Sequence, residues 1–308
     1  MGTTQPTATT MQPISTEVLK NRLTFIGILL LIVGFLLEGL RNLLFIGFRV
    51  TTFSVMVLLA GLLLLGTAGI LFMRMKYLLS LGKLDLNVFF DDPMLKIVSY
   101  LAPLYVLFRG IGFLGGDIII GIGLTVAGIL FLVLVILYQL YRFKGIPPTM
   151  MLLFSILVII IGVFLSVAGF INAGSSAPNI FLAHSGILGI AVLIIGIGLI
   201  IAGFTGQQSA TVIRILLSLG YLLASIALIT GGGLGIRDGI NVLGSRMATA
   251  MLKAIGALLL VAEILGLIAG IMFIIVVLVT LGKELSKAAA AAPPPPPAPQ
   301  APPPPPQQ

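Results

Sequence analysis

The chain has 308 residues, of which 59% are apolar and only 8% are charged, and its mean hydropathy is +1.23. It contains no cysteine and one histidine, which excludes disulfides, thiolate metal sites and every site that needs two histidines. The formal net charge of +8 could indicate a nucleic-acid partner. In so apolar a chain it more often reflects Lys and Arg at the cytoplasmic ends of membrane spans, so we expect no nucleic-acid partner.

Eight long apolar runs follow one another along the chain, and a helix needs about 20 apolar residues to cross a bilayer. No stretch between the runs is long enough to fold as a soluble domain. We therefore predict an all-α, polytopic transmembrane bundle of about eight spans in residues 23–281. A polar segment, 1–22, precedes it, and a disordered cytoplasmic tail, 282–308, follows. The predicted spans are Leu23–Gly39, Thr52–Met73, Ile97–Phe113, Ile118–Leu140, Met150–Ile171, Ile180–Phe204, Val212–Thr230 and Ala254–Leu281.

The residues just before the third span support its predicted start. Asp91-Asp92-Pro93 is typical of a helix N-cap followed by proline at the first helical position, where the missing N–H costs nothing. The two aspartates could instead be a metal pair, but a cap explains them adequately.

The distribution of Lys and Arg predicts the orientation in the membrane. Eleven lie on the side of the N-terminus: Lys20, Arg22, Arg74, Lys76, Lys83, Lys96, Arg142, Lys144, Arg214, Lys283 and Lys287. Six lie on the other side: Arg41, Arg49, Arg109, Arg237, Arg246 and Lys253. Because cytoplasmic segments carry the excess of positive charge, we expect a multi-pass protein of the cell membrane with both termini in the cytoplasm.

The spans pair into four helical hairpins that resemble one another. Every even span contains an Ala-Gly step, and every odd span runs into a glycine-bearing outer turn, such as Gly231-Gly232-Gly233 after the seventh. Duplication of an ancestral hairpin would explain the pattern. Convergence would explain it equally, since small residues are common wherever membrane helices pack closely.

Charged residues flank the predicted outer turns. Arg109 and Asp117 bracket the turn of the second hairpin and could form an ion pair across it. Alternatively, Arg109 extends to the membrane surface and Asp117 caps the next helix. A gating or ligand-binding role is a third interpretation. Glu38 with Arg41, and Arg237 with Asp238, occupy equivalent turns.

Glu263 lies close to the centre of the last span, where an ionisable group is costly and suggests function. The seventh span offers a polar stripe at helical spacing: Thr211, Arg214, Ser218, Tyr221 and Ser225. We predict that the two spans meet along a buried polar seam, in which Glu263 hydrogen-bonds to Ser225 or Tyr221. Its role would be either to hold two helices together or to carry a proton or cation.

No motif indicates a reaction, a cofactor or a metal. The GIGFLG run at 110–115 matches a dinucleotide-binding pattern but follows an apolar helix rather than a strand. His184, the single histidine, lies near the outer end of the sixth span, where an imidazole usually hydrogen-bonds to water or backbone. We therefore expect a protein that is not an enzyme and has no cofactor.

The C-terminal tail changes composition after Lys287. Its prolines, Pro293–Pro306, favour an extended polyproline II conformation. Such a tail could dock into an aromatic groove of a protein partner, or it could be a low-complexity spacer.

The Ile/Leu/Gly-rich spans, the lack of Cys and Trp, and the Pro293–Pro306 tail resemble uncharacterised polytopic membrane proteins of thermophilic archaea. The resemblance is one of composition and implies no activity. Our first hypothesis is a membrane scaffold or accessory subunit whose tail recruits a partner, and the alternative is a small-solute or proton-coupled transporter that uses Glu263. The sequence leaves open whether the protein forms a homo-oligomer or a hetero-oligomer.

Overall fold

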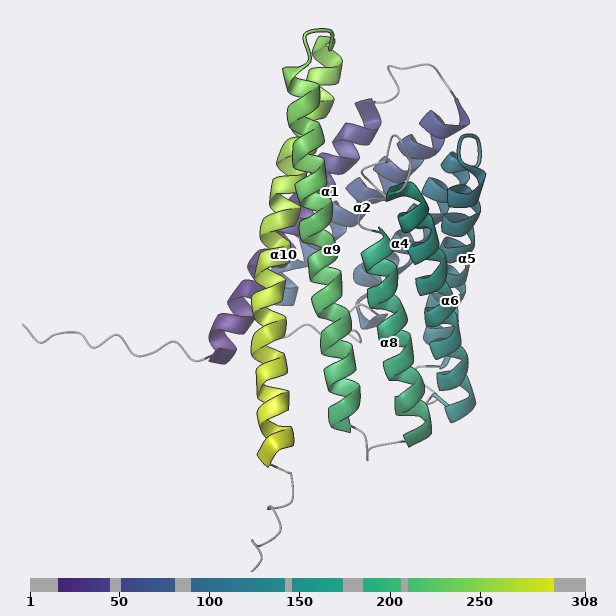
Figure 1. The fold of residues 1–308 in the computed structure, drawn as a ribbon, viewed down its shortest axis with the longest axis vertical. Helices are drawn as coiled ribbons and strands as arrows, with labels where there is room; N and C mark the ends of the chain where they lie inside the picture. Colours follow the sequence, from purple (N-terminus) through teal and green to yellow (C-terminus); the bar gives the residue numbers. More distant parts are fainter. Residues whose placement is uncertain are drawn as a thin grey trace, which may run out of the picture.

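The structure, a computed structural model, describes residues 16–44, 51–80, 90–141, 146–173, 185–205 and 210–290. Within these ranges it contains eight long helices and no strand (Figure 1). In chain order the helices are α1 (Thr16–Leu44), α2 (Thr52–Ser80), α4 (Pro93–Phe113), α5 (Ile118–Tyr141), α6 (Pro148–Ala173), α8 (Ser185–Thr205), α9 (Ala210–Gly244) and α10 (Ala250–Ala290). Each is long and apolar enough to cross a bilayer. The predicted all-α bundle of eight spans is confirmed, and it identifies an integral membrane protein.

The start of α4 has the predicted cap. Asp92 Oδ1 accepts hydrogen bonds from the backbone N–H groups of Met94 (2.9 Å) and Leu95 (3.0 Å), and Pro93 is the first helical residue. Arg74 Nε, near the end of α2, lies 3.2 Å from the same carboxylate oxygen. Asp92 therefore both begins one helix and holds it to the end of the preceding one.

The last two helices are longer than predicted. The seventh span was expected to end at Thr230, but α9 continues through the glycine triplet to Gly244. The reason is packing: a β-carbon on Gly232 would lie 2.9 Å from the carbonyl oxygen of Glu263 on α10, so glycine permits close helix approach here rather than a turn. At its other end α10 continues to Ala290, so residues 282–290 of the predicted tail are helical.

The helices form a closed ring in which chain order is also spatial order. Each helix packs principally against its neighbours in the chain, and α1 closes the ring against α10. The start of α1 and the end of α10 lie toward the same end of the bundle, and the α9–α10 hairpin projects beyond the other helices at the opposite end (Figure 1). Side chains from α1, α2, α4, α9 and α10 can therefore meet inside the ring.

Glycines bring the two helices of each predicted hairpin together. A β-carbon added to any of four of them would lie 2.6–2.7 Å from an atom of the facing helix. These glycines and the residues they face are Gly61 and Asn42, Gly128 and Leu107, Gly162 and Leu193, and Gly256 and Val242. This is the small-residue packing by which membrane helices associate.

Buried residues lie between helices, and large apolar side chains lie on the outside. Leu95 and Ala168 are fully buried, whereas Phe72 and Phe204 are 66% and 73% exposed. Exposed side chains of that size and number suit contact with lipid, because water would penalise so much apolar surface.

Candidate functional site

A buried ion pair on α1 forms the centre of the site. Arg41 Nη2 lies 2.6 Å from Glu38 Oε1, and the Arg41 side chain is only 3% exposed. The two residues are three positions apart, which places them on one face of the helix. The sequence predicted that both lie at the outer turn around Gly39. Instead α1 continues to Leu44 and carries the pair inside the ring.

Helix α4 contributes two further polar side chains, Tyr105 and Arg109, spaced one helical turn apart. Arg109 is 5% exposed and lies over the Phe113 ring, with its guanidinium carbon 5.7 Å from the ring centroid. Both residues interact electrostatically with Glu38 and Arg41. Groups from α1 and α4 therefore share one buried region.

Helix α10 completes this region with Glu263. Its carboxylate interacts electrostatically with Glu38 and Arg41, although 222 positions separate Glu263 from Arg41 in the chain. The side chain lies against Gly235 of α9, where a β-carbon would be 2.5 Å from Glu263 Cδ. A residue larger than glycine at that position would occupy the space of the carboxyl group. We call the five polar residues the ion cluster: Glu38, Arg41, Tyr105, Arg109 and Glu263.

A cavity of about 200 Å³ adjoins the ion cluster. Its wall includes Glu38, Tyr105 and Glu263 from three different helices, and the rest of the lining is apolar or glycine. Two carboxylates thus face one small space inside the ring of helices. Carboxylate oxygens are suited to bind a cation or to exchange a proton, and ionisable groups inside a membrane typically mark an ion or proton pathway.

The predicted polar seam has a different register from the one expected. On α10 it is Gly270 that faces Ser225, because a β-carbon there would lie 3.0 Å from the Ser225 carbonyl oxygen. Gly270 lies two helical turns from Glu263, or about 10 Å. The Ser225 hydroxyl donates to the Tyr221 carbonyl oxygen at 2.8 Å instead of to Glu263. The expected register assumed that α9 ended at Thr230, whereas α9 extends to Gly244 and places Gly232 and Gly235 beside Glu263.

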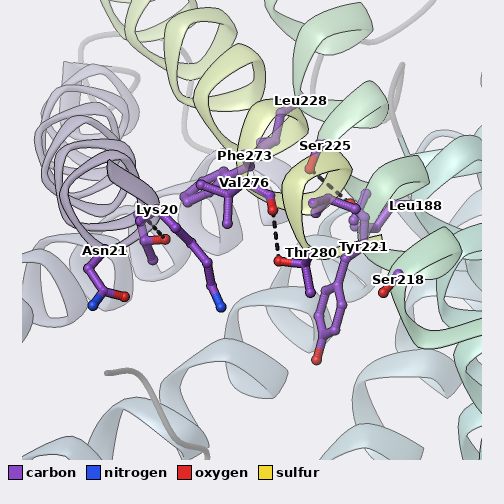
Figure 2. A pocket seen from close by; sticks show the side chains of 13 residues that line it. Lys20, Asn21, Leu188, Ser218, Tyr221, Ser225, Leu228, Phe273, Val276 and Thr280 are labelled. Carbon is purple, nitrogen blue, oxygen red and sulfur yellow. Dashed lines mark hydrogen bonds between the residues drawn. The ribbon is translucent and has the colours of Figure 1, made fainter. Parts of the chain in front are cut away.

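The polar stripe of α9 lines a second cavity instead. Ser218, Tyr221 and Ser225 all contribute to its wall, with Ser218 and Ser225 buried and Tyr221 51% exposed (Figure 2). Three of the five stripe residues thus share this face of α9, and Glu263 does not lie on it.

Arg109 and Asp117 also have separate surroundings. Asp117 Oδ1 accepts a hydrogen bond from the Ile120 N–H at 3.1 Å and so caps α5, as the second of the three interpretations predicted for this residue. Arg109 is buried within the ion cluster. Sequence reasoning missed Tyr105 and treated Glu38 and Arg41 as surface residues. The available signal was their spacing of three and four positions within helices otherwise made of apolar residues.

His184 and Pro293–Pro306 lie outside the described residues, so the interpretations given to them stay predictions. Across the described ranges, no group of three or more His, Cys, Asp or Glu side chains could hold a metal ion. No protein-family model, curated protein or solved structure matches this chain. Proposals about function therefore depend on the physical chemistry of the bundle.

Proposed function

We propose that this integral membrane protein moves a small cation, either a proton or a monovalent ion, across the membrane, with Glu263 as the group that binds and releases it. The observation that carries the proposal is that Glu38, from the first helix, and Glu263, from the last, line one cavity inside the bundle. Burying two carboxylates away from water is costly, so function is the default explanation for such an arrangement.

The surroundings of the two acids favour Glu263 as the carrier. Glu38 is held by Arg41 at 2.6 Å, whereas Glu263 forms no ion pair with any residue that the structure describes. Arg41 and Arg109 are not part of the cavity wall. A cation entering the cavity would therefore meet carboxylate oxygens before it met a guanidinium group. The volume, about 200 Å³, suits an ion with a few waters.

Burial of two arginines strengthens the case for cytoplasmic termini. Six Lys and Arg were assigned to the outer side by sequence, but Arg41 and Arg109 lie inside the bundle and are 3% and 5% exposed. Removing these two leaves four on the outer side against eleven on the side of the termini. We propose on this basis that both termini are cytoplasmic.

The test is flux in proteoliposomes that contain the full chain. A membrane potential would be imposed, and proton uptake and Na⁺ uptake would be followed separately with dyes trapped inside. We expect the wild-type protein to move one of the two cations and Glu263→Gln to reduce the rate to that of protein-free vesicles. The matched control is Glu284→Gln, the same substitution on the same helix at the Arg214 ion pair, which should retain wild-type flux. Equal flux in wild type and Glu263→Gln would refute the role of Glu263.

A scaffold or accessory subunit remains the second candidate, because the Pro293–Pro306 tail could recruit a protein partner. This role would follow if neither cation crossed the membrane with wild-type protein, while Glu263→Gln still assembled normally. Deleting residues 291–308 would then abolish co-purification of a partner from native membranes.

A further inference from the structure

A second and larger cavity occupies the interior near the end of the bundle at which α1 begins and α10 ends. Its volume is about 650 Å³, and α1, α8, α9 and α10 line it (Figure 2). Lys20 and Thr24 come from the first turns of α1, and Thr280 comes from the last third of α10. The cavity thus extends from the start of α1 into the middle of the ring. We call it the inner cavity.

The wall of the inner cavity is chemically suited to water. Three of its hydroxyl groups donate their hydrogens to backbone carbonyls four residues earlier, each at 2.8 Å: Thr24 to Lys20, Ser225 to Tyr221 and Thr280 to Val276. Because a hydroxyl oxygen keeps acceptor lone pairs after it donates, these groups can still accept hydrogen bonds from water. A cavity this roomy with several polar partners holds water rather than remaining empty.

One apolar side chain is common to the two cavities. Leu228 lines the inner cavity and also the small cavity at Glu38 and Glu263. It lies one turn beyond Ser225 on α9, and its Cβ would be 3.2 Å from a β-carbon on Gly270 of α10. Leu228 therefore stands between the polar stripe and the ion cluster. A single apolar constriction of this kind blocks ions by excluding water.

We infer that the inner cavity is a water-filled vestibule leading from the cytoplasmic end to Glu263, and that Leu228 is the barrier between vestibule and ion cluster. The inference rests on the proposed function for the direction of travel. Whether the inner cavity holds water, and whether Leu228 closes it off from the ion cluster, do not depend on transport. Both can be tested without any flux measurement.

The chain has no cysteine, so single cysteines can be introduced without removing any. Ser218→Cys places a thiol in the vestibule. Gly266→Cys places one in the small cavity, where an added β-carbon meets no atom within 4 Å. Leu219→Cys, next to Ser218 but on the exposed apolar face, is the matched control. Reaction with a charged, membrane-impermeant methanethiosulfonate requires a hydrated, ionised thiol, which lipid does not support.

We expect Ser218→Cys to react at least about tenfold faster than Leu219→Cys. Gly266→Cys should react slowly, and Leu228→Ala in the same chain should accelerate it by about tenfold or more, because the constriction is removed. Leu228→Phe should slow it further. Size-exclusion profiles and thermal midpoints would confirm that every variant is folded, and the opposite effects of Ala and Phe would not follow from general loosening of the bundle.

Each outcome decides the inference. Equal labelling rates at positions 218 and 219 would show that the inner cavity is dry. A labelling rate at position 266 that neither Leu228 variant changes would show that Leu228 is not the barrier. If Glu263→Gln abolishes flux but the labelling pattern fails, the proposed function stands and this route is wrong. If the labelling pattern holds but the wild type moves no cation, the vestibule exists and its role in transport is overturned.

Discussion

The carboxyl group of Glu263 on α10 lies directly over Gly235 of α9. A β-carbon on Gly235 would be 2.5 Å from Glu263 Cδ and 2.9 Å from Oε1. One turn away, Gly232 faces backbone instead, with the Glu263 carbonyl oxygen 2.9 Å and the Leu267 nitrogen 3.2 Å from its added β-carbon. The first glycine thus leaves room for an acid, and the second brings two helices into contact.

This difference predicts that alanine at position 232 mainly lowers stability, whereas alanine at position 235 mainly lowers cation flux. Gly232→Ala must push α9 and α10 apart, because backbone cannot move locally, and should lower the free energy of unfolding by about 1–3 kcal/mol. Gly235→Ala should cost less, since the Glu263 side chain can rotate away, but it should lower cation flux. Circular dichroism during heating in detergent would measure stability. As a control, Gly235→Ala should not lower the unfolding midpoint in a Glu263→Ala background, where the facing carboxyl group is absent, and an added loss of stability there would contradict the account.

Loss of one member of the Glu38–Arg41 pair should destabilise the protein more than loss of both members. Arg41→Met leaves a carboxylate buried beside the cavity without its closest cation, and loss of one partner of a buried pair costs about 3–5 kcal/mol. Replacing both residues, as Glu38→Leu with Arg41→Met, should recover most of that loss, because no uncompensated charge remains.

The same thermal measurement on Arg214→Met provides the comparison. Arg214 Nη1 lies 3.2 Å from Glu284 Oε2, and the Arg214 side chain is 58% exposed. Loss of so exposed a pair should cost no more than about 1 kcal/mol. If Arg41→Met were equally mild, the ion cluster would not be buried as described.

Asp92 should separate capping from charge pairing. Asp92→Asn keeps an oxygen that can accept from Met94 and Leu95, so only the interaction with Arg74 weakens. Asp92→Ala loses the cap as well and should lower the free energy of unfolding by about 0.5–2 kcal/mol relative to wild type. Unfolding midpoints that follow the order wild type, Asn, Ala would agree with this assignment. Equal losses for Asn and Ala would show that the charge, not the cap, matters.

Much of the fold could be predicted because lipid imposes a simple rule on composition. Runs of about 20 apolar residues, with a cap such as Asp92-Pro93, define each span almost independently of the others. The end of α9 could not be predicted in this way. Gly231-Gly232-Gly233 has the composition of a turn, and only the facing surface of α10 makes it a helix contact.

The candidate site was predictable only in part for a related reason. The depth of Glu263 follows from counting residues along one helix, whereas its neighbours depend on how the ring closes. Arg41 and Arg109 look like ordinary charges near span ends, and α1 and α4 carry them inward. The spacing of residues along one helix does not show which distant helix that helix will contact.

Closure of α1 against α10 also has a consequence for how the protein is made. At about 5–20 residues per second, synthesis from Leu44 to Ala250 takes roughly 10–40 s, so the first helix enters the bilayer long before its last neighbour exists. During that interval Glu38 neutralises Arg41 from within the same helix, one turn away. The nascent segment therefore enters the hydrocarbon with its two buried charges already balanced, and the acid of the last helix arrives to find the other charges in place.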